Sequence, residues 1–133
     1  MENYRQNLGS KGEKIAVQYC RNVGYMIIGT HYTSRWGEID IIAKDKKEIV
    51  FIEVKSRASK SFGSPEESIT KEKISRLIKT IAIFLSDYPK IVEYRIDVIL
   101  VLFGVERVSP LVEHIKRIEI SGDLDDENSD IEI

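Results

Sequence analysis

The sequence contains little cysteine, histidine or proline. Of its 133 residues, one is Cys, two are His and three are Pro. A single Cys excludes a disulfide framework and any zinc site that is built on pairs of cysteines. The apolar runs, of which 98–103 is typical, are far too short to cross a bilayer, so we expect no membrane partner. Residues 1–9 are polar and lack the apolar core of a signal sequence, and we therefore expect a cytoplasmic protein.

Neither sign of charge dominates the chain, which has 20 basic and 22 acidic residues. Six of the acids lie in residues 121–133, where there is no basic residue, so residues 1–120 carry 20 basic against 16 acidic side chains. The composition, 42% hydrophobic and 32% charged, is typical of one soluble domain. We predict a single domain over 1–120 and a disordered acidic tail over 121–133. The mildly basic body is compatible with a polyanionic partner and equally with an ordinary solvated surface.

Hydrophobic periodicity predicts the element order α-β-β-β-α-β-β. Apolar residues at helical spacing indicate helices, and β-branched or alternating runs indicate strands. Gly24 is placed to end the first helix, and residues 44–47 are expected to form a tight hairpin turn. This order favours an α/β domain in which helices flank a mixed sheet. The expected helices are 10–22 and 66–85, and the expected strands are 25–32, 37–43, 48–57, 94–103 and 111–120.

Three ionisable side chains fall within two otherwise apolar strands. Side chains alternate along a strand, so Glu53 and Lys55 share one face. Pairing between the two strands of the hairpin can place Asp40 beside them. The competing interpretation is a cross-strand salt bridge on a solvated face, worth about 0–1 kcal/mol.

Two desolvated carboxylates in one place are unfavourable unless a cation compensates them. Mg²⁺, and also Mn²⁺, binds carboxylate and carbonyl oxygens and keeps several water ligands. We expect Asp40, Glu53 and the carbonyl of Val54 to hold such an ion. Lys55 would then activate the attacking water and stabilise charge on a phosphate.

These residues carry a resemblance to known proteins. Asp40, followed after twelve residues by Glu53-Val54-Lys55, resembles the PD-(D/E)xK nuclease core, with Ile39 in place of the proline of that motif. Several segments together resemble the YraN-like family of uncharacterised, endonuclease-like bacterial proteins, which is similar to archaeal Holliday-junction resolvases and to restriction endonucleases. The segments are Gly12-Glu13, Gly37-Glu38-Ile39-Asp40, residues 51–57, residues 62–65, Lys71 and Arg95-Ile96-Asp97-Val98. The resemblance implies a restriction-endonuclease-like fold and magnesium-dependent cleavage of DNA, including branched DNA.

The resemblance also implies roles for residues outside the two strands. Glu13 becomes an auxiliary acid that approaches the metal through water; the alternative is a capping box with Ser10. Glu38 shares the face of Asp40 in a regular strand and is interpreted as a charge at the rim of the site, with a further ligand as the alternative. Four basic residues are expected to contact the DNA backbone, or else to be ordinary surface charges. They are Arg35, Arg57, Lys71 and Lys73.

The remaining chemically distinctive residues are given structural interpretations. Arg95 and Asp97 share a strand face and are expected to pair with each other. His31 and His114 have no spacing typical of a metal site. Cys20 is expected to lie in or near the core without a chemical role.

The sequence therefore predicts a magnesium-dependent endonuclease as its leading function. The alternatives are a nucleic-acid-binding module of the same fold without significant catalysis, and a partner-binding protein whose acidic tail contacts a basic surface. A homodimer is also expected, because an apolar sheet edge near 98–103 would need to be covered.

Overall fold

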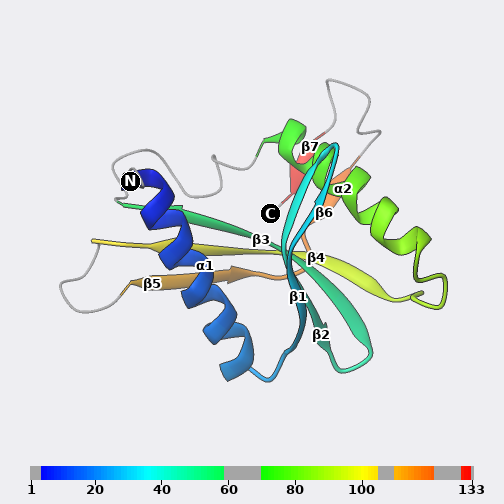
Figure 1. Ribbon diagram of the computed structural model, residues 1–133, viewed down its shortest axis with the longest axis horizontal. Coiled ribbons are helices and arrows are strands. Elements are labelled where there is room, and N and C mark those ends of the chain that lie inside the picture. The colour runs from blue at the N-terminus through cyan, green and yellow to red at the C-terminus, as the bar shows by residue number, and fades with distance from the viewer. Residues whose placement is uncertain (1–3, 59–69, 105–109, 122–129, 133) are drawn as a thin grey trace.

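The predicted element order and the α/β fold are confirmed by a computed structural model, which describes residues 4–58, 70–104, 110–121 and 130–132 (Figure 1). Strands β1 to β5 form one sheet in chain order, in which β3 and β4 are parallel and the other neighbours are antiparallel. No helix in the described ranges has both the length and the apolar character that a bilayer span requires. The elements are α1 Tyr4–Asn22, β1 Met26–Ser34, β2 Gly37–Asp45, β3 Glu48–Arg57, α2 Lys71–Ser86, β4 Tyr94–Leu102, β5 Leu111–Ile115, β6 Glu119–Ser121 and β7 Asp130–Glu132.

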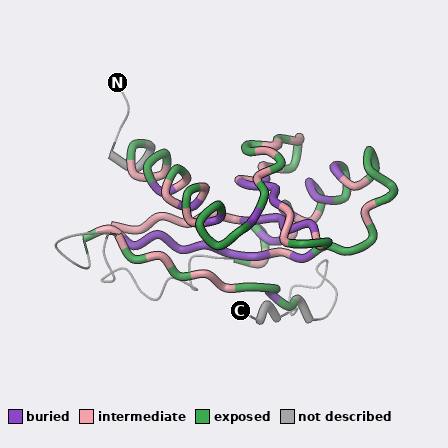
Figure 2. The backbone as a smooth tube through the Cα atoms, turned by 90° about the horizontal axis from the view of Figure 1, so that it is seen from below, coloured by how far each residue is buried: buried purple, intermediate pink, exposed green. Residues whose placement is uncertain are grey.

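The two helices pack on opposite faces of β3 and β4. Along β3, Val50 and Ile52 belong to a core cluster with Cys20 of α1, whereas Phe51 belongs to a cluster with Phe84 of α2. Cys20 is fully buried, as predicted. Because both faces of these strands are covered, their sequences are continuous apolar runs and do not alternate between apolar and polar residues. Figure 2 shows the buried residues concentrated along the central strands, with exposed residues on the outer turns.

Helix α1 begins earlier than the sequence pattern predicted. It starts at Tyr4, so Ser10 lies inside the helix and not at its N-terminus. The capping box of Ser10 with Glu13 is therefore wrong, since only a residue at the N-cap can satisfy the first free amides. The helix ends where expected, and Gly24 takes a left-handed conformation with φ of 95°.

Thr70, which the sequence pattern placed inside a helix over 66–85, is instead the residue just before α2. The side chain of Thr70 caps this helix by accepting a hydrogen bond from the Lys73 amide, and Lys71 is its first residue. The expected helical residues 66–69 lie outside the described residues. Strand β3 has the predicted bounds, and β2 runs two residues further than predicted, to Asp45.

The C-terminal part differs from the prediction in two ways. The expected strand 111–120 is two strands, because Arg117 takes a left-handed conformation between β5 and β6. Residues 130–132, in the tail that we expected to be disordered, form β7 and pair with β6, so the prediction is wrong for these three residues. Strand β5 pairs along β4 and covers it. The apolar edge on which the expected homodimer depended is therefore absent, and the homodimer stays a prediction without that support.

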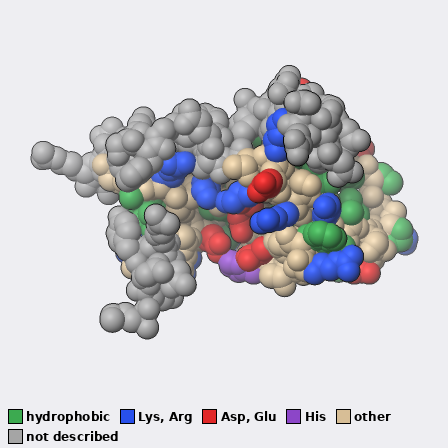
Figure 3. All heavy atoms as spheres, turned by 90° about the horizontal axis from the view of Figure 1, so that it is seen from above, with side chains coloured by type: hydrophobic (Ala, Val, Ile, Leu, Met, Phe, Trp, Pro, Cys, Tyr) green, Lys and Arg blue, Asp and Glu red, His purple; other side chains and the backbone are tan. Residues whose placement is uncertain are grey.

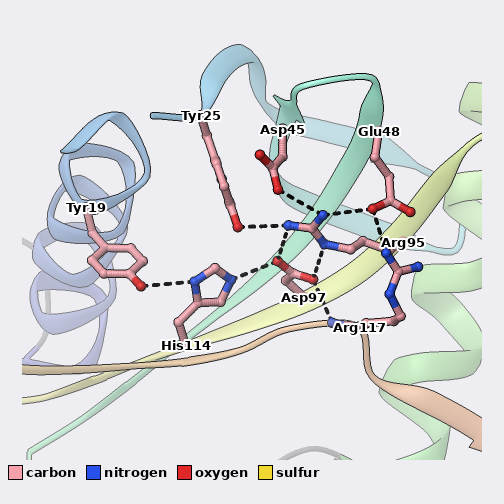
Figure 4. A network of polar contacts seen from close by, with 8 residues as sticks. All are labelled: Tyr19, Tyr25, Asp45, Glu48, Arg95, Asp97, His114 and Arg117. Carbon is pink, nitrogen blue, oxygen red and sulfur yellow. Dashed lines mark hydrogen bonds and ion pairs between the residues drawn. The ribbon is translucent and has the colours of Figure 1, made fainter. Parts of the chain in front are cut away.

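A buried polar network connects α1 to β4 and β5 (Figure 4). The predicted pair is confirmed: Arg95 Nε donates to Asp97 Oδ1 at 3.0 Å. His114 Nε2 lies 2.7 Å from Asp97 Oδ2, and its other ring nitrogen lies 3.0 Å from the hydroxyl of Tyr19 on α1. We call these residues and their further partners the Arg95 network. Its members are Tyr19, Tyr25, Asp45, Glu48, Arg95, Asp97, His114 and Arg117.

Candidate active site

The candidate site lies where β2 and β3 stop pairing. The ladder between them ends at the pair Ile41–Ile52, so Asp40 and Glu53 would form the next pair. Instead, Asp40 Oδ2 accepts a hydrogen bond from the amide of Val54 at 2.8 Å. A side chain thus replaces the backbone acceptor that a continuing ladder would supply. In an antiparallel ladder the N–H and C=O of one residue face the same neighbouring strand, so the Val54 carbonyl also faces this gap.

Asp40 and Glu53 form a carboxyl pair in this gap. Burial raises the pKa of Glu53 to about 8, helped by the charge of Asp40 and by the side-chain hydrogen bond between them. Burial also raises the pKa of Asp40, although the Val54 amide opposes that shift. The Glu53 side chain is only 18% exposed. Without a cation, the pair therefore retains a proton near neutral pH.

Two lysines adjoin the carboxyl pair. Lys73 Nζ of α2 lies 4.0 Å from Glu53 Oε1. The pKa of Lys55 is lowered to about 8, first by a side-chain hydrogen bond with Lys73, then by burial and by the charge of Lys73. Asp40, Glu53, Lys55 and Lys73 are called the acid–lysine cluster below. The three residues that the strand pattern singled out therefore lie together. Lys73, which was expected to contact the DNA backbone, lies beside them.

Glu13 reaches the same region from α1, and it meets a histidine there. Glu13 Oε2 lies 2.8 Å from His31 Nε2, and His31 Nδ1 makes a close contact with Glu38. Burial raises the pKa of Glu13, and the charge of Asp40 adds to this. A hollow of about 380 Å³ between α1 and the β1–β2 hairpin is lined by Glu13, His31 and Asp40. The auxiliary position that the resemblance implied for Glu13 thus fits its surroundings.

The sequence spacing of the two histidines gave no indication of a metal site, but the structure places His31 in a cluster of ligand-type side chains. Its ring offers a ligand atom within 4.8 Å of one from Glu13 and one from Glu38. The register of the hairpin formed by β1 and β2 could have predicted part of this arrangement from the sequence. A turn between Ser34 and Gly37 places His31 opposite Asp40, although that pair does not form because His31 has a φ of 56°.

The strand is also irregular at Asp40. Ile39 packs in the cluster with α2, whereas Ile41 packs in the cluster with α1, so the two side chains point to opposite faces despite their spacing of two. A regular strand would place them on the same face. Asp40 therefore lies at the point where β2 changes the face that it presents to each helix.

The predicted DNA-contacting residues lie in different places. Arg57 ends β3, where its charge contributes to lowering the pKa of Lys55, and Lys71 begins α2. Lys73 belongs to the acid–lysine cluster. Arg35 lies at the β1–β2 turn, with its guanidinium 5.1 Å from the centre of the Trp36 ring.

Exposed cations connect the cluster to that turn. Lys73, Arg76 and Lys79 follow one another at a spacing of three along α2, which places them on one side of the helix. Lys79 Nζ lies 4.3 Å from the centre of the Trp36 ring, next to Arg35. We call these four cations the basic ridge. Figure 3 shows Lys and Arg side chains gathered beside a group of acidic ones on this face.

Gly12 allows α1 to approach β3 closely. A Cβ atom at Gly12 would lie 1.7 Å from Ser56 Oγ and 3.0 Å from Ser56 Cβ. Glycine inside a helix costs about 1 kcal/mol relative to alanine. The close approach offsets this cost, and it sets the position from which the neighbouring Glu13 reaches the site.

Gly12→Ala is therefore expected to lower the free energy of unfolding by about 1–2 kcal/mol, despite the better helix propensity of alanine. The matched control is Gly9→Ala on the same helix, where a Cβ has nothing within 4 Å, and it should gain about 0.5–1 kcal/mol. Urea unfolding measures both. Adding Ser56→Gly should rescue Gly12→Ala, and a Gly12→Ala protein as stable as Gly9→Ala would contradict the close approach.

Comparison with known proteins identifies the family. The model of the family described as "Uncharacterised protein family UPF0102" matches residues 12–101, more than half of the chain. The chain belongs to this family. The match includes Glu13, Asp40, Glu53 and Lys55, so the UPF0102 region contains all the catalytic candidates.

Individual UPF0102 proteins match over much of their length. The chain is similar to a UPF0102 protein of Clostridium botulinum, with 48% identity over 85 residues that cover 64% of this chain and 69% of the relative. It is 40% identical to one of Syntrophomonas wolfei over 111 residues, 83% of this chain and 95% of the relative. It is 38% identical to a UPF0102 protein of Mycolicibacterium vanbaalenii over 113 residues, which cover 84% of this chain and 93% of the relative. The names of these relatives state the family and no activity.

Proposed function

We propose that this protein is a magnesium-dependent endonuclease of the PD-(D/E)xK type that hydrolyses phosphodiester bonds of DNA, branched DNA included. The observation that carries the proposal is the carboxyl pair of Asp40 and Glu53 in the gap between β2 and β3, with Lys55 on the same strand. A buried pair of carboxyl groups at a break in a sheet has no evident structural benefit, because both retaining its proton and ionising it lower the stability of the fold at neutral pH. Such pairs are typical of functional sites.

The residues present fit a hard divalent cation. Asp40 and Glu53 offer carboxylate oxygens, and the Val54 carbonyl faces the same gap. These are the donor types that Mg²⁺ prefers, and Mn²⁺ accepts them too. A bound ion would neutralise the charge that now raises the pKa of Glu53. When bound, it would supply a polarised water and positive charge next to a phosphate.

Lys55 has the properties that the reaction requires of a protein group. With a pKa of about 8, a substantial fraction of its amino groups is neutral near physiological pH and can accept a proton at Nζ. The protonated fraction can instead donate hydrogen bonds to a non-bridging phosphate oxygen and stabilise charge there. Lys73 favours the neutral form of Lys55, since two ammonium groups in contact repel each other.

The basic ridge provides a path for the DNA backbone up to the carboxyl pair. Its four cations are exposed and extend from Glu53 to the β1–β2 turn. Contacts of this kind hold the phosphates without reading the sequence, and their strength falls with added salt. The ridge fits a backbone-binding enzyme better than a sequence-specific DNA reader.

Nicking and binding assays with Lys55→Met test the proposal. This variant keeps the aliphatic stem and removes the ammonium, so it should cleave at least about 100-fold more slowly and bind DNA within a few-fold of the wild type. Lys90→Met, at an exposed lysine after α2, is the matched control and should cleave normally. The substrates are linear duplex, single-stranded and four-way-junction DNA, each with Mg²⁺ or Mn²⁺.

The assay also separates the alternative function. Wild-type protein that binds these DNAs but cuts none of them with either metal would contradict the endonuclease and favour a binding module without catalysis. Equal cleavage by Lys55→Met and the wild type would remove the assigned role of Lys55.

A further inference from the structure

Glu13, His31 and Glu38 form a second group of ligand-type side chains, separate from the carboxyl pair. They come from α1, β1 and β2, and one ligand atom of each lies within 4.8 Å of the others. Among the described residues this is the one group of three or more such side chains that meets this distance. Side chains from α1 and from the β1–β2 hairpin therefore converge on one small volume.

An ion pair is the simplest account of this group, but it leaves charge uncompensated. A protonated His31 faces the carboxylates of Glu13 and Glu38, and the charge of Asp40 also acts on its ring. One imidazolium thus faces three acidic groups. The His31 side chain is 54% exposed, and ion pairs so open to water contribute little to stability. Stability alone gives little reason to gather these groups.

The surroundings of the ring offer a donor set for a metal ion. His31 has a carboxylate beside each of its two ring nitrogens. An imidazole nitrogen with carboxylate oxygens close by is a common donor set for a transition-metal ion. The hollow of about 380 Å³ adjoining Glu13 and His31 gives water and ions access.

We propose that Glu13, His31 and Glu38 bind a divalent first-row transition-metal ion of the Zn²⁺ or Co²⁺ class. An imidazole with two carboxylates suits such ions, whereas Mg²⁺ favours oxygen ligands alone. Ligands at about 2.0–2.2 Å in a tetrahedral site lie roughly 3.4 Å apart. The three ligand atoms already lie within 4.8 Å of one another, so small shifts of the side chains are enough. Water would complete the coordination. Its ligands differ from the Asp40 and Glu53 carboxylates assigned to Mg²⁺, although Glu13, His31 and Asp40 line the same hollow, and its occupancy does not depend on cleavage of DNA.

Titration of the full-length protein with Co²⁺ tests the site, because bound Co²⁺ has visible absorption bands that report its ligands. Isothermal titration with Zn²⁺ provides the affinity. Both are performed in the Glu53→Gln background, which weakens the carboxyl pair as a ligand set and leaves the three proposed ligands intact. We expect one Co²⁺ bound per chain, displaced by Zn²⁺ and not by millimolar Mg²⁺.

In that background, His31→Asn and, separately, Glu38→Gln should each weaken binding by about tenfold or more. Both side chains lie at the protein surface, so the variants should keep the circular dichroism spectrum of the parent. Glu93→Gln, which removes an exposed carboxylate before β4, should bind like the parent. The proposal is overturned if the parent binds no Co²⁺ or Zn²⁺, or if neither His31→Asn nor Glu38→Gln changes the affinity. Nicking assays on the wild type are independent of this result, so the two proposals can fail separately.

Discussion

Replacing Glu53 with glutamine is expected to abolish DNA cleavage and, at the same time, to stabilise the metal-free protein. Glutamine keeps the shape of the side chain but cannot ionise, so the variant loses a metal ligand and the repulsion of the carboxyl pair. The cleavage rate should fall at least about 1,000-fold, as expected for loss of a group that binds the catalytic ion. A change that removes activity and increases stability is typical of a residue retained for function.

The size of the stability gain depends on pH. The pKa of Glu53 is about 8 in the folded protein, above its ordinary value of about 4.3. The folded state therefore binds this proton more tightly than the unfolded state does. The resulting stability is fully present below the ordinary pKa and is lost as the pH rises through about 8. The Glu53→Gln variant does not lose stability in this way, so its gain in free energy of unfolding over the wild type should be largest above pH 8.

Water still reaches the Glu53 side chain, so we expect a gain of about 1–2 kcal/mol at pH 9, or about 3–8 °C in Tm. Thermal unfolding at pH 5 and pH 9, without metal, measures it. Millimolar Mg²⁺ should raise the Tm of the wild type and have little effect on the variant. Glu93→Gln is the control for loss of an exposed carboxylate. Retained cleavage, or a variant less stable than the wild type at pH 9, would contradict the assignment of Glu53.

Asp97→Asn is expected to cause the largest loss of stability among the changes considered. The Asp97 side chain is fully buried. It accepts hydrogen bonds from Arg95 Nε at 3.0 Å and from the Arg117 amide at 2.8 Å, and His114 Nε2 lies 2.7 Å away. An asparagine amide cannot replace this set of acceptors, and it removes the fully buried counter-charge of Arg95, leaving only the more exposed Asp45 and Glu48. Removing one partner of a buried ion pair costs about 3–5 kcal/mol.

The same residue makes the wild type sensitive to acid. Burial alone would raise the pKa of Asp97, but the hydrogen bonds from His114, Arg95 and the Arg117 amide outweigh it and hold that pKa below its ordinary value. The stability from this group is present above the ordinary pKa and is lost as the pH falls through the lower, folded-state pKa. The difference in free energy of unfolding between the wild type and Asp97→Asn should therefore become smaller in strong acid.

Urea unfolding at pH 7 and pH 3 measures both effects. Asp87→Asn, at the exposed C-terminal cap of α2, is the control and should change stability by less than about 0.5 kcal/mol. Because the Arg95 network is separate from the carboxyl pair, cleavage per folded molecule should stay near that of the wild type at low temperature. A loss below about 1 kcal/mol at pH 7 would show that the network does not depend on Asp97.

The sequence by itself determined the elements whose signals are local. The bounds of β3, the end of α1 just before Gly24 and the burial of β4 follow from periodicity and backbone preference over a few residues. The proximity of Asp40 to Glu53 and Lys55 was also predictable, because a short hairpin leaves few registers in which the apolar faces match. The pairing of Arg95 with Asp97 followed from the alternation of side chains along one strand.

Only the tertiary structure decided which distant residues join the site. Lys73 meets Glu53 because of the way α2 crosses the sheet, and Glu13 meets His31 because Gly12 lets α1 approach β3 closely. The role of Ser10 depended on where α1 begins, which the spacing of Ser10 and Glu13 did not reveal. Periods of 2 and 3.6 residues describe which face a side chain occupies within its own element. They contain no information about the packing of one element on another, which is set by the shape of the whole core.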